Sequence, residues 1–335
     1  MTLLRFVFIL FLLSLANSSH AEESSHPSKH VILISIDGLR SDAIKALGQK
    51  RASAFYQMIR EGASTFNART DDDMTVTIPN HTSMITGYPV LGKNGHHVTI
   101  NTDSSQSVHD YARRHIESLF DVLHENHRQS AMLASKLKFD IYQKSYPIDF
   151  VSLTDQNDLK TLQAFKKVAQ VKLPDFIFMH FAGADRVGHQ KGWDISPGSF
   201  YLNELEILNG YLDSILKVIL LNEDLKNSTL VILTTDHGGE GTNHADESNP
   251  HNYTIPFFVW GYSVSRGGDL YKINSDHRQD PKTKRIQYSN PRQPIRNSDA
   301  ANLAAKFLGL PVITGSTMSN TYPMKTKEDQ SELKK

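Results

Sequence analysis

The sharpest chemical signal in this sequence is the run Asp236-His237-Gly238-Gly239, which follows the apolar stretch 228–234. The stretch has the β-branched, apolar character of a buried strand. A strand that ends in these residues would deliver a carboxylate and an imidazole to the carboxyl edge of a sheet, where open α/β folds keep their sites. Oxygen and nitrogen donors of this kind suit zinc or a similar divalent ion.

Two further apolar stretches end in donors of the same kind. Asp37 directly follows residues 30–36, and Asp185 and His189 follow residues 174–181. Because Asp185 and His189 are four residues apart, one turn of helix would place both on one face. Three predicted strands therefore carry candidate metal ligands at their carboxyl ends.

His244, in the loop after the Asp-His pair, completes a set of three carboxylates and three imidazoles. His251 is its main rival for that place, and His180, within a predicted strand, would either support the ligands or simply pack. A single aspartate after a strand is most often a turn or capping residue. It is the joint placement of all the members that indicates one metal site.

Thr77 is the candidate nucleophile. It lies just ahead of a helix that we expect to open near Pro79, because proline is favoured in a first helical turn. The free backbone N–H groups and the positive dipole end there favour an anion, and bound metal ions would activate a water or a hydroxyl. The competing interpretations are that Thr77 only caps the helix and that Thr75 is the nucleophile.

The elements that would position these residues alternate between strand and helix along nearly the whole chain. The expected strands are 30–36, 130–135, 174–181, 229–235 and 255–260. The expected helices are 41–47, 52–61, 79–85, 109–125, 159–171, 199–221 and 299–308, and 261–296 is expected to be a loop. This alternation predicts an α/β fold, a three-layer αβα sandwich with a mostly parallel central sheet.

The composition excludes several classes of protein. The chain has 335 residues, and with neither an internal repeat nor a Gly/Ser-rich linker it is best explained as one domain. It has 36 basic and 36 acidic residues, so it carries no nucleic-acid-binding footprint. It has no cysteine, which excludes disulfides, thiolate zinc ligands and a cysteine nucleophile.

Residues 1–21 are typical of a secretory signal peptide, with a positively charged start, an apolar stretch over 6–15 and small residues ahead of a cleavage site before Glu22. The apolar stretch is shorter than the roughly 20 residues that a membrane span needs. We expect a periplasmic or secreted protein that has no membrane segment after cleavage. The catalytic domain would then cover 22–324 and a charged tail 325–335, and the oligomeric state stays open.

Together the motifs resemble the alkaline phosphatase superfamily, and most closely its type I phosphodiesterase/nucleotide pyrophosphatase branch with the sulfatase-like relatives. The resemblance rests, in the family's order, on Asp37-Gly-Leu-Arg-Ser-Asp42, Thr77-Ile-Pro-Asn-His81, Asp185-x-x-x-His189 and Asp236-His-Gly-Gly239. It implies an alkaline phosphatase-like fold and two divalent metal ions, usually zinc. It also implies that the ligands of one ion are Asp37, Thr77, Asp236 and His237, and those of the other Asp185, His189 and His244.

The resemblance further implies that Thr77 attacks phosphorus and forms a covalent phospho-enzyme that water then hydrolyses. The segment Gly95-His-His-Val-Thr-Ile-Asn101 is similar to a family stretch whose asparagine contacts the phosphoryl oxygens, so that role falls to Asn101. Two departures narrow the assignment. Sulfatases need a Cys/Ser-x-Pro-x-Arg motif that this chain lacks. Nucleotide pyrophosphatases keep their last histidine ligand far downstream of the Asp-His pair, where this chain has no good match, since His277 is the only histidine beyond His251.

The expected function is therefore an exported bimetallic hydrolase that cleaves phosphodiester or pyrophosphate bonds in small-molecule phosphate esters. One alternative is a phosphomonoesterase or phosphoryl-transferring enzyme on the same scaffold. Another, of a different class, is a non-catalytic exported metal-binding protein. The aromatic candidates for stacking on a nucleobase, which we expect more often to be core residues, are Phe181, Trp193, Tyr201 and Tyr253.

Overall fold

The computed structural model describes residues 28–318 and 324–327. The predicted signal peptide lies outside the described residues, as does most of the predicted charged tail, and both stay predictions. No helix among the described residues is both long and apolar enough to cross a membrane.

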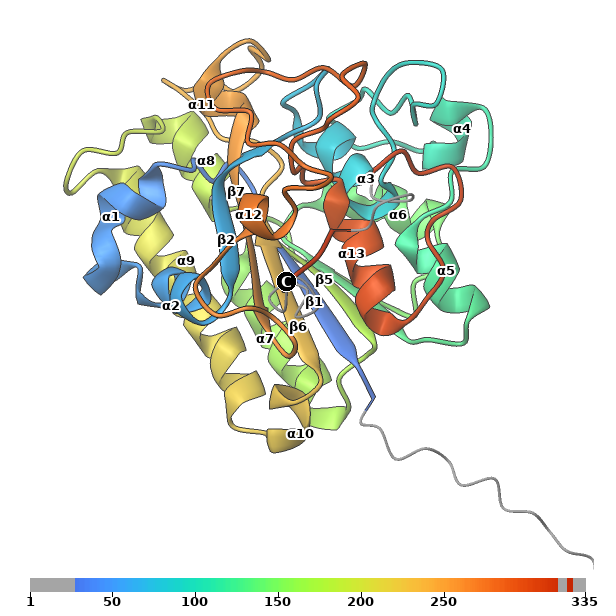
Figure 1. Ribbon diagram of the computed structural model, residues 1–335, viewed down its shortest axis with the longest axis horizontal. Coiled ribbons are helices and arrows are strands. Elements are labelled where there is room, and N and C mark those ends of the chain that lie inside the picture. The colour runs from blue at the N-terminus through green and yellow to red at the C-terminus, as the bar shows by residue number, and fades with distance from the viewer. Residues whose placement is uncertain (1–27, 319–323, 328–335) are drawn as a thin grey trace, which may run out of the picture.

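Eight strands form one central sheet in the order β4-β3-β5-β1-β6-β7-β2-β8 (Figure 1). The strands are β1 (His30–Ile36), β2 (Ala63–Arg69), β3 (Ser130–Ala134), β4 (Phe150–Leu153), β5 (Phe176–Phe181), β6 (Thr229–Thr234), β7 (Thr254–Gly261) and β8 (Gly268–Asp269). Strand β1 pairs in parallel with β5 and β6, whereas β7 runs antiparallel to both β6 and β2. The expected α/β fold with a mostly parallel sheet is confirmed.

Helices cover both faces of the sheet, so the molecule has three layers (Figure 1). One layer holds α1 (Ala43–Arg51), α2 (Ser53–Glu61), α7 (Asp158–Val171), α8 (Gly183–Lys191), α9 (Phe200–Leu220) and α10 (Glu223–Lys226). The other holds α3 (Thr77–Thr86), α4 (Val108–Ala112), α5 (Leu119–Glu125), α6 (Asp140–Ser145), α12 (Leu270–Ile273) and α13 (Asp299–Leu308). The short elements η1 (Leu137–Phe139) and α11 (Pro250–Tyr253) belong to connections at the carboxyl end of the sheet.

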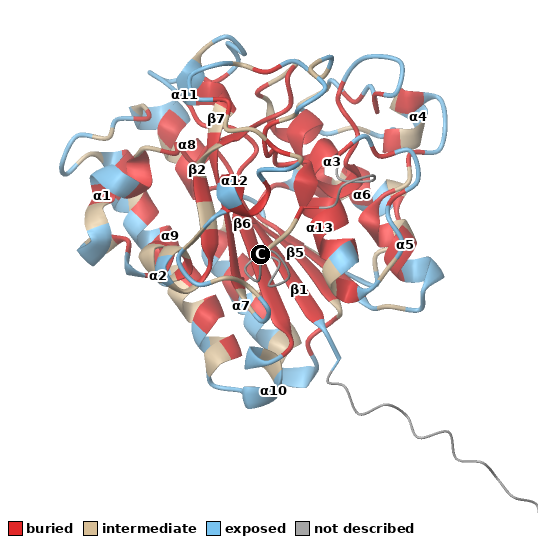
Figure 2. Ribbon diagram, in the orientation of Figure 1, coloured by how far each residue is buried: buried red, intermediate tan, exposed pale blue. Residues whose placement is uncertain are grey.

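Strand β1 shows why a continuous apolar run predicts a central strand. Its residues face the two layers alternately: Val31 and Leu33 pack in one core, and Ile32, Ile34 and Ile36 in the other. All five are at most 1% exposed, and the central strands are buried throughout (Figure 2). A strand buried on both faces gains from apolar residues at every position rather than at alternate ones.

The structure corrects the predicted helix 109–125, which is two helices. Helix α4 ends at Arg113, whose φ of 52° is left-handed, and Ser118 begins α5 with a reciprocal capping box to Asp121. Strands β2 and β4 were not predicted, because β2 is only partly apolar and β4 has four residues, none of them buried. The predicted loop 261–296 contains β8 and α12.

Helix α3 begins at Thr77 rather than near Pro79. Thr77 is therefore the first residue of the helix, and all ten residues of α3 are buried. Gly87 ends the helix in the left-handed conformation, with a φ of 71°.

Candidate active site

The predicted metal ligands meet at the carboxyl edge of three neighbouring strands, toward the top of Figure 1. Asp37 follows β1, the pair Asp236-His237 follows β6, and Asp185 lies in α8, which follows β5. The register places the last residues of these strands side by side. The aspartates emerge at one place because parallel strands end at a common edge.

The ligand atoms form two overlapping buried clusters. Those of Asp37, Asp236 and His237 lie within 4.8 Å of one another, as do those of Asp185, His237 and His244. His237 belongs to both clusters, and its ring stacks on that of His244 with centroids 3.6 Å apart. The two groups of donors are thus contiguous and share one imidazole.

The histidines present the same ring nitrogen to the carboxylates. Nδ1 of His237 donates to Gly238 O (2.8 Å), that of His244 to Thr75 O (2.6 Å) and that of His189 to Thr242 O (3.0 Å). A carbonyl cannot donate, so each Nδ1 carries a proton, and in the neutral imidazole Nε2 then holds the lone pair. Main-chain carbonyls that fix the tautomer in this way are the usual support of metal-binding histidines.

Lone pairs face one another across the site. His237 Nε2 is 3.2 Å from Asp236 Oδ2 and 3.5 Å from Asp37 Oδ1, and His244 Nε2 is 3.8 Å from Asp185 Oδ1. His237 Nε2 and these three oxygens are buried and have no hydrogen-bond partner. Buried acceptors without a donor are costly, and a divalent cation among them would satisfy them. The donor set fits the metals that the sequence predicts.

The two rival histidines differ in their surroundings. His244 is 5% exposed and lies against Asp185. The side chain of His251 is 44% exposed and lies beside Arg40 and Asp42, outside both clusters. His189 is not a member of either cluster, because its ring nitrogens do not lie within 4.8 Å of all the other ligand atoms. Its Nε2 is nevertheless 3.3 Å from Asp185 Oδ1. The structure therefore brings His189 and His244 to the site and leaves His251 outside it.

Thr77 and Thr75 also have different roles. Thr77 is 1% exposed and lines a cavity of about 760 Å³, together with Asp185 and His244. The hydroxyl of Thr75 donates to His244 O, and Thr75 O accepts the proton of His244 Nδ1. Thr75 thus fixes the loop after Gly239 that carries His244, which we call the ligand loop. Thr77 instead faces the space that a substrate would enter.

Asn101 lines the same cavity and has a fixed orientation. Its Oδ1 accepts from Ile78 N–H (3.2 Å) and from Lys138 Nζ (2.7 Å). Both partners are donors, so the amide nitrogen of Asn101 must be the other atom, and its two protons remain for a ligand. The start of α3 is further held by His81, which donates from Nδ1 to Thr77 O and bonds Ser35 Oγ through Nε2.

Sequence reasoning missed two lysines of this cavity, Lys136 and Lys138. Lys136 is 6% exposed, and its Nζ lies 2.6 Å from Asp37 Oδ2 and 2.7 Å from Asp185 Oδ2. Lys138 forms no ion pair with a carboxylate among residues 28–318 and 324–327. The signal was available, because both follow the predicted strand 130–135 just as Asp37 follows its own strand.

The charges of the site are strongly coupled. Burial opposes ionisation of Asp37, but Lys136 and His180 outweigh it and hold the pKa of that carboxyl well below its usual value. Burial and the neighbouring Asp37 raise the pKa of Asp236 well above its usual value. Burial lowers the pKa of His244 to about 3, so its imidazole is neutral, as a metal ligand must be.

His180 supports the ligands. Its Nε2 donates to Asp37 Oδ2 over 2.9 Å, from within β5. It thereby fixes the side of the carboxylate that faces away from His237. Of the two interpretations that the sequence left open, the structure selects the supporting one.

The glycines after the Asp-His pair are required by close approach. A Cβ on Gly238 would lie 2.0 Å from His251 O, and one on Gly239 would lie 2.2 Å from the ring of Trp193. Trp193 in turn donates from Nε1 to Gly38 O (2.8 Å). The two glycines therefore let the ligand loop turn tightly over the tryptophan.

No aromatic ring of the four predicted candidates lines the cavity, among the residues described. Each is at most 5% exposed, as expected for core residues: Phe181, Trp193, Tyr201 and Tyr253. The walls around Thr77 are polar instead, with Asp103, Asp155, Gln156 and Arg186 among the lining residues.

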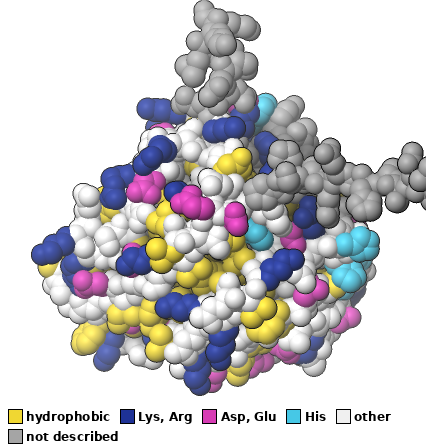
Figure 3. Space-filling model, turned by 90° about the horizontal axis from the view of Figure 1, so that it is seen from below, with side chains coloured by type: hydrophobic (Ala, Val, Ile, Leu, Met, Phe, Trp, Pro, Cys, Tyr) yellow, Lys and Arg dark blue, Asp and Glu magenta, His cyan; other side chains and the backbone are white. Residues whose placement is uncertain are grey.

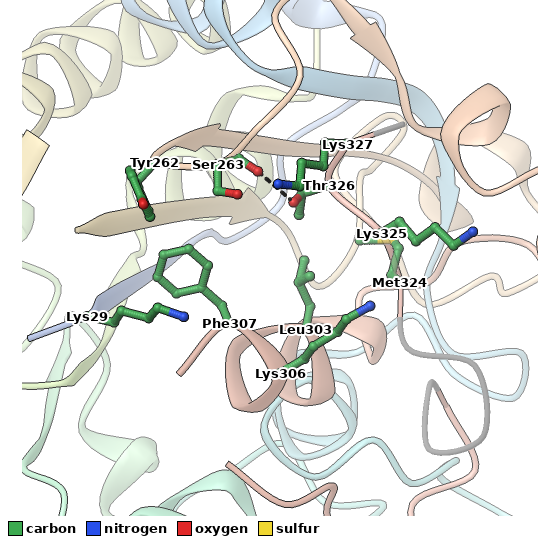
Figure 4. Close-up of a pocket in the computed structure, with 10 residues that line it drawn as sticks. All are labelled: Lys29, Tyr262, Ser263, Leu303, Lys306, Phe307, Met324, Lys325, Thr326 and Lys327. Atoms are coloured by element: carbon green, nitrogen blue, oxygen red, sulfur yellow. Dashed lines mark hydrogen bonds between the residues drawn. The ribbon is translucent and has the colours of Figure 1, made fainter. Parts of the chain in front are cut away.

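A second cavity, of about 310 Å³, lies at the opposite end of the sheet, where β1 begins and β7 ends (Figure 4). It is lined by Lys29, Tyr262, Ser263, Leu303, Lys306, Phe307, Met324, Lys325, Thr326 and Lys327. None of these ten described residues is a carboxylate or a histidine. Seen from below, the molecule shows apolar side chains among Lys and Arg (Figure 3).

Comparison with solved structures places this fold among phosphoesterases and their relatives. Murine ectonucleotide pyrophosphatase/phosphodiesterase 5 is 12% identical, with a TM-score of 0.62 over 85% of this chain and 96% of that chain. A protein of the alkaline phosphatase superfamily from Vibrio parahaemolyticus is 13% identical, with a TM-score of 0.56 over 88% and 69%. A 2-O GAG sulfatase is 12% identical, with a TM-score of 0.63 over 90% and 75%.

At these identities the likeness shows the fold alone. An inactive variant of the murine protein has been solved in complex with AMP, with a TM-score of 0.60 and 12% identity over 85% of this chain and 96% of that chain. No curated protein sequence matches this chain. The sequence itself matches the model of a family described as type I phosphodiesterase/nucleotide pyrophosphatase over residues 31–303, a range that contains every predicted site residue. The chain therefore belongs to the type I phosphodiesterase/nucleotide pyrophosphatase family of phosphoric ester hydrolases.

Proposed function

We propose that this chain is an exported, metal-dependent hydrolase that cleaves phosphodiester or pyrophosphate bonds with Thr77 as nucleophile. The observation that carries the proposal is the set of partnerless carboxylate and imidazole lone pairs at a cavity that Thr77 also lines. A non-catalytic metal-binding protein would need the clusters but not a free hydroxyl beside them. Export rests on the composition of residues 1–21.

Two divalent cations held by Asp37, Asp236, His237, Asp185, His189 and His244, with zinc the best match to these donors, would stabilise charge on the oxygens around phosphorus and lower the pKa of the Thr77 hydroxyl. Thr77 Oγ loses its proton and attacks phosphorus. The new O–P bond forms as the ester P–O bond breaks, and the leaving oxygen takes up a proton. Water then hydrolyses the phospho-threonine and restores the hydroxyl.

The residues around Thr77 supply the remaining groups. The free amide protons of Asn101 meet the phosphoryl oxygens, since Ile78 N–H and Lys138 already fill its carbonyl oxygen. His81 fixes the first turn of α3 through Thr77 O and so sets the direction of attack. Donors fixed before the substrate arrives need not reorganise in the transition state, which is the main electrostatic contribution to such catalysis.

The test combines metal analysis with a panel of four substrates. Purified protein is assayed with bis-p-nitrophenyl phosphate, p-nitrophenyl phosphate, a nucleoside 5′-ester and p-nitrophenyl sulfate, before and after chelation. We expect hydrolysis of the phosphate esters, loss of activity on chelation and recovery with Zn²⁺. Metal binding without turnover of any ester would instead support the non-catalytic alternative.

The position of Lys138 supports a second candidate function, phosphomonoester hydrolysis. It lies beside Asn101 in the cavity and has no described carboxylate partner. Burial and the neighbouring Lys136 lower the pKa of Lys138 to about 8, against the opposing effect of the more distant carboxylates. A monoester brings one more negative charge on the transferred phosphoryl group than a diester does, and Lys138 is placed to meet it.

Replacing Lys138 separates these two functions. We expect Lys138→Met to lower kcat/KM for p-nitrophenyl phosphate by about 10- to 100-fold, the value of one charged hydrogen bond, and to change the diester by less than about 3-fold. Lys144→Met is the control, because Lys144 pairs with Asp140 outside the Thr77 cavity. An equal loss of kcat/KM on both esters would show that Lys138 does not discriminate between substrates by their charge.

A further inference from the structure

Lys136 holds one carboxylate from each predicted metal site. Its Nζ lies 2.6 Å from Asp37 Oδ2 and 2.7 Å from Asp185 Oδ2, and the side chain is almost fully buried at the end of β3. Asp37 belongs to the cluster with Asp236, and Asp185 to the cluster with His244. A single ammonium group thus connects the two sites.

The two carboxylates use their oxygens in the same way. Oδ2 of Asp37 and of Asp185 faces Lys136, whereas Oδ1 of each has no hydrogen-bond partner and faces histidine Nε2 atoms. Among the described residues Lys136 is the donor to Asp185 Oδ2, while Asp37 Oδ2 also accepts from His180. Lys136 therefore orients both carboxylates with one oxygen turned toward the position of a cation.

The charge balance gives Lys136 a second task. Asp37, Asp185 and Asp236 are each at most 5% exposed, and Lys136 forms ion pairs with Asp37 and Asp185. Without a metal ion, its charge is what compensates the pair that it bonds. Removing one partner of a buried ion pair is strongly destabilising, because the other charge is left uncompensated.

We propose that Lys136 is an internal counter-cation shared by the two metal sites, which keeps Asp37 and Asp185 oriented for metal and stabilises the metal-free protein. The inference rests on the proposed metal sites but not on the proposed reaction. It makes Lys136 a positioning residue, distinct from Lys138, which contacts no metal-site carboxylate.

The first test compares thermal unfolding with and without metal. We expect Lys136→Met to lower the unfolding midpoint of the chelated protein by about 5–15 °C, and that of the Zn²⁺-loaded protein by less than half as much, because bound cations then compensate the carboxylates. Lys138→Met, two residues along in the same cavity, should leave both midpoints within about 2 °C. Equal losses with and without metal would overturn the proposal, as would no loss at all.

The second test reads both sites directly. Co²⁺ is titrated into metal-free protein and its visible absorption is recorded, a signal that requires no substrate. Lys136→Met should change the absorption of both bound ions, whereas Lys138→Met should match the wild type. A change confined to one ion would refute the sharing of Lys136.

Lys136→Arg keeps the test decisive if the methionine variant does not fold. The guanidinium retains the charge but is larger and planar, with its donors in a different geometry. We therefore expect the metal-free midpoint to recover at least half of the loss while the cobalt spectrum stays altered. A fully wild-type spectrum would contradict the orienting role. A protein that binds Co²⁺ with these effects but hydrolyses no ester would refute the proposed function and leave the present proposal standing.

Discussion

Thr77→Ala is expected to reduce phosphoester hydrolysis by at least about 10⁴-fold while the metal content stays unchanged, since loss of a covalent nucleophile removes a whole reaction route. Metal should remain because the other ligands are intact, with Asp37, Asp236 and His237 still within reach of one ion. The measurement pairs the rate on a chromogenic ester with elemental analysis of the same sample.

Thr75→Val is the matched control. The valine keeps the shape of threonine and the carbonyl that accepts from His244 Nδ1, and it loses only the hydroxyl that donates to His244 O. We expect an activity loss of no more than about 10-fold, by loosening of the ligand loop. Near-normal hydrolysis by Thr77→Ala would exclude Thr77 as the nucleophile. So would a loss of activity in Thr75→Val that exceeds the loss in Thr77→Ala.

The sequence predicted best those parts of the fold whose apolar pattern is clear. Strand β1 and helix α13 have the predicted bounds, His30–Ile36 and Asp299–Leu308. In both, apolar periodicity and clear end signals agree. The edge strand β4 was missed, because its residues are partly exposed and its sequence lacks a continuous apolar run.

The ligand set could be predicted for a simple physical reason. Parallel strands end at one edge, so three acidic segments after three strands must approach one another there. What could not be predicted is the order of the strands, which makes β5, β1 and β6 neighbours. Nor does the sequence distinguish His244 from His251, because that choice depends on how the loop after Gly239 folds against Thr75.

The lysines show the limit of residue type as a guide. A lysine after a strand is usually solvated, so neither Lys136 nor Lys138 stood out. Their importance comes from contacts across 99 and 37 positions of sequence, to Asp37 and to Asn101. Their place after the predicted strand 130–135 is a local signal, but which groups they pair with is decided by the tertiary fold.

The same contacts indicate how two related activities could share one scaffold. Thr77, the metal ligands and Asn101 would act on any phosphoryl group. Lys138 adds a charge whose value depends on the charge of that group. A substrate preference set by one side chain beside a common centre requires no change in the sheet or in the ligand loops.

Asp236→Asn is expected to abolish one metal site and to stabilise the metal-free protein. Activity should fall by at least about 10³-fold, because the amide nitrogen cannot bind a cation. The metal-free midpoint should rise by about 2–8 °C. Asp236 Oδ1 already accepts from Gly38 N–H and His237 N–H, and an amide oxygen would keep both bonds. The new N–H group would replace the partnerless Oδ2, 3.2 Å from the lone pair of His237 Nε2.

The stabilisation should also depend on pH with a defined sign. Burial and Asp37 raise the pKa of Asp236 above its value of 3.8 in an unfolded chain. The contribution of this carboxyl to stability is therefore greatest below about pH 4 and is lost as the pH rises. The advantage of Asp236→Asn, measured by thermal unfolding after chelation, should then be larger at pH 8 than at pH 4. A metal-free variant less stable than the wild type at pH 8 would show that Asp236 is held by a partner other than metal, and with it the assignment of this cluster as a cation site would fail.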